Sequence, residues 1–336
     1  HEKYGCSWYS WDEDSLHGIV LNSQIMNAAL PEAKKQREWL ESDLQTHAGK
    51  RILIFMHLPP YLENIGEPAL GHYDNIDEPD RTWLLNLFRT YRVETVFAGH
   101  SHFSFFDRMG DTRYYIAAST SFTRPGFAEC FSSCPPAEQG RNDIGKLGFY
   151  LVRIVKNGVR VHFIRTHGNT ERFKDSMREH RVITRLSGDL PDSPLGVSLR
   201  HPLSNLVEIP IAFPSVIRQR VRNDYPLLSC IELGVRHLRV PSGDLKDDFQ
   251  CQRLAILRDE GVQITAVWQW SEHAALTDEV ARYGDLLDGV ELQILGTPRP
   301  ASKMLEDMHH TKENLAIPIT LSTVILRERI FGKQHN

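Results

Sequence analysis

The sequence predicts an α/β protein with two domains, and three observations lead to this prediction. Short apolar runs alternate with segments of helical periodicity over about the first hundred residues, hairpin signals follow, and a strand-plus-helix unit then repeats towards the carboxyl terminus. A chain of 336 residues accommodates two domains of ordinary size. We expect a layered α/β domain at 1–168, a linker at 169–200 and a repeated β/α domain at 201–336.

The first domain is expected to begin with alternating strands and helices and to end in antiparallel hairpins. Pro31 favours a helix start, because proline is well tolerated in the first turn of a helix. The run 51–56 is compact and apolar, which is typical of a strand buried on both faces, and Asn157-Gly158 is a strong hairpin signal. In chain order, the expected elements are strands at 8–11 and 17–23, the helix opened by Pro31, the strand 51–56, a helix containing Trp83 and Tyr91, the strand 93–98, and hairpins at 103–118 and 149–165.

A repeat of 27 or 28 residues marks the second domain. A valine or isoleucine that follows a small residue recurs at Val235, Val262, Val290 and Ile317, and residues 206–213 are a candidate for an earlier step. Such a period indicates parallel strands joined by crossover helices. A closed β/α barrel needs eight such units, and only about five are present. We therefore expect a partial TIM-like barrel, with an open sheet as the alternative.

The composition excludes several classes of protein. The chain has 39 basic and 43 acidic residues and a net charge of −4, which gives no electrostatic surplus for binding a nucleic-acid backbone. No run approaches the ~18 apolar residues of a membrane span, and five cysteines are too few for a disulfide scaffold. The chain begins at His1 without an initiator methionine, so we expect a piece of a longer protein. The residues predict neither compartment nor oligomeric state.

Histidines follow two of the predicted buried strands. His57 opens His57-Leu58-Pro59-Pro60, and the second strand runs into Gly99-His100-Ser101-His102. Ligand-binding groups gather at the carboxyl ends of strands in α/β sheets, so the three imidazoles can converge there. Gly99 is expected to let the backbone pass close to that point. A lone histidine is more often structural, but two strand-end motifs together favour a transition-metal site.

At these residues the sequence resembles the calcineurin-like metallophosphoesterase superfamily. The resemblance covers about residues 1–168 and corresponds to the C-terminal part of that family's catalytic domain. The matching segments, in the family's order, are Tyr4-Gly5 with Trp8-Tyr9-Ser10-Trp11, the strand 17–23, the helix 36–40, His57-Leu58-Pro59-Pro60, and the run 97–102 with its Gly-His-Ser-His. The fold that this implies is a layered α/β sandwich, incomplete at its amino terminus.

The resemblance also implies a two-metal site and a reaction. Carried over, His57 and His100 would bind one divalent or trivalent ion and His102 the other, with Mn, Fe or Zn as the expected metals. Two adjacent ions activate a bridging hydroxide for in-line attack on phosphorus. The implied activity is hydrolysis of a phosphoric monoester or diester, with a small-molecule or phosphorylated substrate. Ser101 is expected to be a spacer.

The chain departs from the family pattern upstream of His57. The motifs D-x-H and G-D-x-x-D are absent there, so this chain is expected to supply only the downstream ligands and to have little activity alone. His1-Glu2 matches the last two residues of G-N-H-E, which would make His1 the acid–base histidine. The loop between the two histidine motifs is where substrate contacts are expected, and its candidates are His72, Tyr73, Asp74 and Asn75.

Two other interpretations remain open. A circular permutation would take G-D-x-x-D from 188–192 or 243–247 and D-x-H from 307–309, but these motifs come in the wrong order and Gly-Asp pairs are common in turns. The other is a carbohydrate- or protein-binding module with a degenerate phosphoesterase scaffold. Its candidate residues lie at the strand ends of the second domain and include Arg239, Ser242, Gln269, Trp270 and Gln293, although a buried tryptophan there is commoner than a sugar platform.

Overall fold

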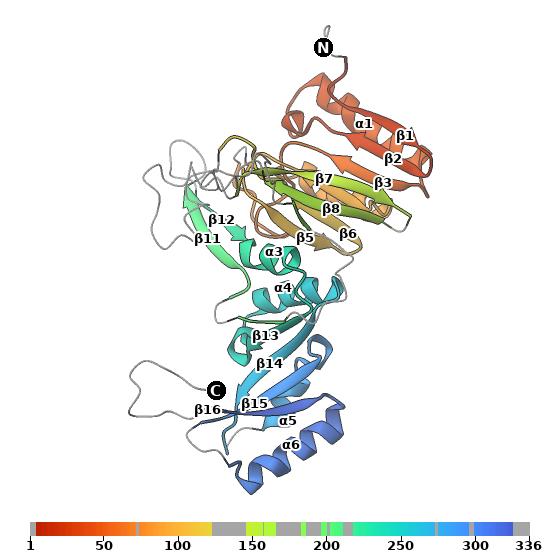
Figure 1. The fold of residues 1–336 in the computed structure, drawn as a ribbon. Coiled ribbons are helices and arrows are strands. Elements are labelled where there is room, and N and C mark those ends of the chain that lie inside the picture. Colours follow the sequence, from red (N-terminus) through yellow and green to blue (C-terminus); the bar gives the residue numbers. More distant parts are fainter. Residues whose placement is uncertain are drawn as a thin grey trace, which may run out of the picture. The chain divides into compact units, whose positions relative to one another are not determined.

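The computed structural model describes residues 5–71, 74–122, 146–156, 158–165, 183–185, 196–199, 202–210, 218–272, 275–295 and 299–324. The chain divides into two compact units. The first comprises 1–187 and 204–229, and the second comprises 188–203 and 230–336. Both units are mixed α/β structures built around parallel strands (Figure 1).

The main sheet of the first unit has six strands in the order β1-β2-β3-β4-β6-β5. Strands β2, β3, β4 and β6 are parallel, and two hairpins add β1 and β5 antiparallel to them. The central strands are the most buried, as apolar runs in parallel sheets are. The bounds are β1 (Tyr9–Glu13), β2 (Leu16–Val20), β3 (Arg51–Phe55), β4 (Thr95–Ala98), β5 (Phe105–Met109) and β6 (Thr112–Ile116).

Two helices connect the parallel strands of this sheet. After the short 3-10 turn η1 (Ser23–Ile25), α1 (Pro31–Thr46) joins β2 to β3, and α2 (Asp80–Thr90) joins β3 to β4. Their apolar stripes bury Leu40, Leu44, Leu84 and Phe88 in the same core as Ile54. Pro31 is the first residue of α1, so the expected helix start is confirmed.

A second, antiparallel sheet completes the layers of the first unit. It consists of β7 (Gly148–Val155), β8 (Gly158–Arg165) and β9 (Ile183–Arg185), and Figure 1 shows β7 and β8 lying over the main sheet. Tyr150 joins the two sheets, because its hydroxyl donates to the Ile116 carbonyl at 2.7 Å and its ring packs on Tyr115 at 5.9 Å. The result is a layered α/β fold, as the sequence predicts.

The segment 204–229 belongs to the first unit, although the sequence placed it after the linker. Its strands β11 (Asn205–Pro210) and β12 (Arg218–Asn223) form an antiparallel hairpin, and α3 (Tyr225–Glu232) follows. Residues 206–210 of the candidate repeat step therefore lie in one arm of a hairpin rather than in a strand of the repeated β/α units. The physical reason is Arg222, which is fully buried against Asp107 and Asp224 within this unit.

The second unit is a five-stranded parallel sheet whose strands follow one another in chain order. The repeated residues all lie within two positions of the start of a strand, so the expected β/α units are present; these residues are Val235, Val262, Val290 and Ile317. Its order is β10-β13-β14-β15-β16, and the described residues form an open sheet without closure into a barrel. The strands are β10 (Gly196–Ser198), β13 (His237–Pro241), β14 (Gln263–Gln269), β15 (Gly289–Leu295) and β16 (Ile319–Val324).

Helices follow these strands, as the repeat predicts. They are the 3-10 segments η4 (Ser242–Lys246) and η5 (Gly284–Leu286) and the α-helices α4 (Asp248–Asp259), α5 (Leu276–Ala281) and α6 (Ser302–Leu315). Alternate strand residues such as Val240, Ile264 and Leu292 are buried. On the other face of the sheet, Arg239 of β13 pairs with Glu291 of β15.

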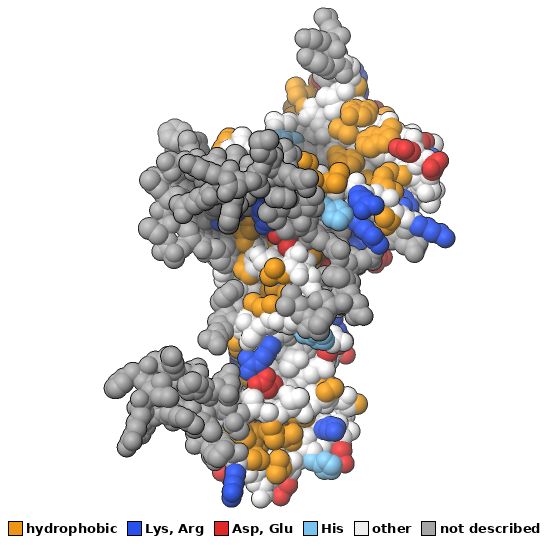
Figure 2. Space-filling view, viewed as in Figure 1, with side chains coloured by type: hydrophobic (Ala, Val, Ile, Leu, Met, Phe, Trp, Pro, Cys, Tyr) orange, Lys and Arg blue, Asp and Glu red, His pale blue; other side chains and the backbone are white. Residues whose placement is uncertain are grey.

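Hydrophobic, acidic and basic side chains are intermixed on the face of the molecule drawn in Figure 2. This distribution agrees with the near balance of charges in the sequence. In the described part of the chain, no helix combines the length and the apolar character needed to cross a membrane.

Candidate metal centre

Parallel pairing of β3 and β4 brings the two histidine motifs together. Phe55 is opposite Phe97 in the register of the two strands, and the Met56 amide donates to the Phe97 carbonyl at 3.0 Å. One step further, the Gly99 amide donates to the carbonyl of His57, also at 3.0 Å. The ladder therefore continues past both strands and fixes the loops that bear the histidines.

His57 and His100 are in direct contact at these strand ends. Nδ1 of His100 lies 2.9 Å from Nε2 of His57, and the ring centroids are 4.8 Å apart with the planes 79° to each other. Two imidazole nitrogens bound to one ion at about 2.1 Å are separated by about 3.0–3.4 Å, depending on whether the ligands are octahedral or tetrahedral. A small outward movement of either ring would accommodate an ion, so this pair fits the donor set of a transition metal.

A buried carboxylate lies on the far side of the His100 ring. Nε2 of His100 is 3.4 Å from Oδ1 of Asp74, whose side chain is fully buried. A metal-binding histidine typically presents its second nitrogen to such a carboxylate, which fixes the orientation of the ring. The sequence placed Asp74 among the loop candidates for substrate contact and did not predict its position beside His100.

The environment of His57 favours its neutral form. Partial burial lowers the pKa of His57 below its usual value, and the proximity of His100 and His102 adds to the effect. A neutral imidazole keeps a lone pair for a metal ion. The backbone at this position is held by Ser23, whose buried hydroxyl accepts from the amides of His57 at 3.1 Å and Leu58 at 2.6 Å.

The turn after β4 differs from expectation at Gly99. A side-chain Cβ at Gly99 would lie 3.9 Å from the nearest atom, an ordinary contact, so close approach does not require glycine there. The left-handed conformations belong instead to His100, with φ 70°, and His102, with φ 60°. Such conformations are disfavoured for residues other than glycine and concentrate at functional sites. Ser101 between them is fully buried, as a spacer would be, and the His102 ring packs edge-on against Phe122 at 4.4 Å.

The other site residues predicted from the sequence are not seen beside the histidine pair. His1, His72 and Tyr73 lie outside the described residues. Asn75 is only 6% exposed, and its amide nitrogen donates to the carboxylate of Glu67 within the same loop. Through this hydrogen bond, Asn75 stabilises the loop between the two histidine motifs.

A second group of potential ligands lies at the opposite end of the sheet, where β2 begins. One atom each of Asp12, His17 and His47 lies within 4.8 Å of the others. The geometry favours an ion-paired cluster, since the two rings are stacked at 3.7 Å, so their lone pairs do not converge. Both His17 nitrogens lie on carboxylates, at 2.8 Å from Asp12 and 2.7 Å from Asp43, and Lys50 already lies 2.8 Å from Asp12.

The fold and the strand-end histidines are consistent with a phosphoesterase-type α/β protein. No protein-family model matches the chain. Two curated proteins match part of the chain, and both are named serine/threonine-protein phosphatase CPPED1. The zebrafish (Danio rerio) protein is 32% identical over 108 residues, which cover 30% of this chain and 34% of that protein. The bovine (Bos taurus) protein is 31% identical over 106 residues, covering 30% and 33%.

The chain thus matches about a third of the length of each relative. The similarity is therefore to part of two proteins named as phosphatases. Two solved structures are more distant. GAP50, the anchor in the inner membrane complex of Plasmodium, has a TM-score of 0.35 and 15% identity over 47% of this chain and 50% of that one. Purple acid phosphatase PPD1 from yellow lupin has a TM-score of 0.30 and 14% identity over 47% and 30%. Both TM-scores are too low to establish a shared fold.

Proposed function

We propose that this chain supplies part of a metal centre that hydrolyses a phosphoric ester. The observation that carries the proposal is the 2.9 Å approach of His57 and His100 from the ends of two adjacent parallel strands. The left-handed turn of His100 and the buried Asp74 beside it are what a preorganised ligand needs. The similarity to proteins named as phosphatases supports phosphate esters as substrates.

Each side chain then has a defined role. His57 and His100 hold one ion, Asp74 orients His100, and His102 is proposed as a ligand of a second ion. Bound Mn, Fe or Zn would supply an activated hydroxide and a clamp for the phosphoryl oxygens. His1 stays a prediction for the acid–base role. The loop residues His72, Tyr73 and Asn75 stay predictions for substrate contact.

Metal binding to the 336-residue chain tests the ligand assignment. Dialysis against Mn²⁺ or Zn²⁺ followed by elemental analysis is expected to show a bound ion that is lost in His57→Ala and His100→Ala. His237→Ala is the matched control, because that histidine is exposed at the start of β13 in the other unit. An ion that is kept in His100→Ala but lost in His47→Ala would place metal at the Asp12 cluster and overturn the assignment.

Activity is the second test. Candidate substrates are p-nitrophenyl phosphate for monoesters, its bis ester for diesters, and a phosphoserine peptide, which the names of the relatives indicate. We expect weak turnover by the 336-residue chain and metal-dependent turnover by any longer product of its gene. In that longer product, a His100→Ala variant that retains its rate would refute the proposed function.

We also propose that the second unit is part of a β/α barrel. The strands there follow one another in chain order, with repeat steps of 27 and 28 residues, as barrel strands do. A longer product of the gene that adds further β/α units to this open sheet would support the barrel.

A further inference from the structure

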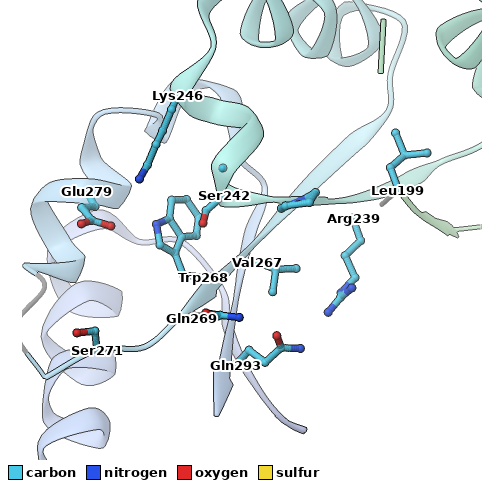
Figure 3. Close-up of a pocket in the computed structure, with 12 residues that line it drawn as sticks. Leu199, Arg239, Ser242, Lys246, Val267, Trp268, Gln269, Ser271, Glu279 and Gln293 are labelled. Carbon is cyan, nitrogen blue, oxygen red and sulfur yellow. The ribbon is translucent and has the colours of Figure 1, made fainter. Parts of the chain in front are cut away.

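A cavity of about 600 Å³ lies in the second unit, at the carboxyl ends of its parallel strands (Figure 3). Strand ends β13, β14 and β15 line it, together with η4 and α5. Open parallel sheets bind their ligands at this edge, where strand side chains and the following loops meet. The volume falls within the range of small-molecule sites. The phosphoesterase proposal makes no use of this cavity.

Neutral hydrogen-bonding groups face this cavity from neighbouring strands. Gln269 and Gln293 are opposite one another in the parallel register of β14 and β15, so their amide side chains lie on the same face of the sheet. Ser242, the first residue of η4, adds a hydroxyl. None of these three side chains has a hydrogen-bond partner in the described part of the chain. Together they offer both donors and acceptors to a ligand.

The charges around the cavity are balanced. Arg239 is already held by both carboxylate oxygens of Glu291, at 2.5 and 2.7 Å, and donates to Ser198 at 2.9 Å. Lys246 and Glu279 add one formal charge of each sign, and Figure 3 shows both on the same side of β14 as Trp268. A site for phosphate or carboxylate would show a surplus of positive charge. This lining therefore favours a neutral ligand.

The walls between these polar groups are apolar. Val267 and Leu199 line the cavity on the side of Arg239, while the indole of Trp268 lies on the other side of β14 (Figure 3). Trp268 is only 6% exposed, so little of its indole is available for stacking on a ligand. A ligand that displays hydroxyl groups around a ring of C–H bonds would match both the amides and these walls.

We propose that this cavity binds a neutral polyhydroxylated ring compound, a sugar of about one or two rings, through Gln269, Gln293 and Ser242. Binding is independent of the strand-end histidines of the first unit.

Saturation-transfer NMR on the full 336-residue chain tests this proposal. The probes are glucose, galactose, N-acetylglucosamine, maltose and cellobiose, with glucose 6-phosphate and citrate as charged comparisons. We expect at least one neutral sugar to bind, and Gln269→Ala combined with Gln293→Ala to weaken it by at least about tenfold. Gln263→Ala is the matched control, because it changes the same residue type at the opposite, exposed end of β14.

Three results would overturn the proposal. The first is that no neutral sugar binds when the ligand is in 50-fold excess over the protein. The second is that the double variant binds sugar as well as the original chain does. The third is that only the charged probes bind. His100→Ala should leave sugar binding intact while it removes the ion in the metal test. Failure of one proposal is therefore distinguishable from failure of the other.

Discussion

Replacing Arg222 with methionine is expected to lower the free energy of unfolding of the first unit by about 3–5 kcal/mol. The guanidinium is fully buried and every one of its N–H groups is directed at an acceptor. Nε lies 2.7 Å from Oδ1 of Asp224, and Nη1 lies 2.9 Å from Oδ2 of Asp107 and 3.3 Å from the Glu63 carbonyl. Nη2 lies 2.7 Å from the Phe106 carbonyl and 2.8 Å from Oδ2 of Asp224. It also lies 4.0 Å over the ring of Phe105.

The magnitude follows from what the substitution leaves behind. Methionine fills much of the volume, so the cavity contribution is small, but two buried carboxylates lose their counter-ion. Burial already raises the pKa values of Asp107 and Asp224, and Arg222 opposes that rise. Without it both carboxyls would bind protons more readily when folded than when unfolded. The variant should therefore lose more stability as the pH rises.

Urea unfolding of the full chain, followed by circular dichroism at pH 5 and pH 8, measures the loss. A melting temperature lower by roughly 10 °C is expected for a unit of this size. Arg220→Met is the matched control on the same strand, since that side chain is 54% exposed and its pair with Glu63 is worth at most about 1 kcal/mol. A loss below about 1 kcal/mol in Arg222→Met, or one equal to the control, would refute the reasoning.

Three further predictions concern the same unit. Burial raises the pKa of Glu67 from 4.5 to about 7, so the folded chain keeps a proton that the unfolded chain releases. The free energy of unfolding should therefore fall by up to about 3 kcal/mol as the pH rises from 4.5 through 7. Glu67→Gln should lose this dependence in urea titrations; an unchanged slope would contradict it. Gly18→Ala places a Cβ about 2.2 Å from the Trp11 ring and should cost about 1–3 kcal/mol in thermal melts, whereas an unchanged melting temperature would show that the ring moves freely. Asp74→Asn should weaken Mn²⁺ binding about 10- to 100-fold without unfolding the chain, measured by titration beside the exposed control Asp111→Asn; equal affinities would remove Asp74 from the site.

Much of the local structure could be predicted from the sequence. Apolar runs placed β3 and β4 within three residues of their observed starts, because buried parallel strands leave a dense hydrophobic signature. The repeat around Val262 and Val290 likewise gave the parallel strands of the second unit, since each β/α step repeats the same local pattern. These features depend on neighbours within a few residues.

The features that could not be predicted from the sequence depend on contacts between residues that are far apart along the chain. Arg222 sits in a run of alternating charged residues that is typical of an exposed strand, and its burial follows from Asp107, 115 positions away. The approach of His57 and His100 was expected from the strand ends, whereas the contributions of Ser23 and Asp74 arise from loops that only the folded chain brings near. No local pattern distinguishes such residues from ordinary loop polar groups.

The interleaving of the two units along the chain has a consequence for inheritance. Because 188–203 belongs to the second unit and 204–229 to the first, a genetic crossover within the polar segment 169–200 would separate the Asp107 carboxylate from its guanidinium. A crossover after 229 would instead remove β10 from the parallel sheet. Neither unit is one continuous segment of the chain, so a single crossover transfers neither of them whole.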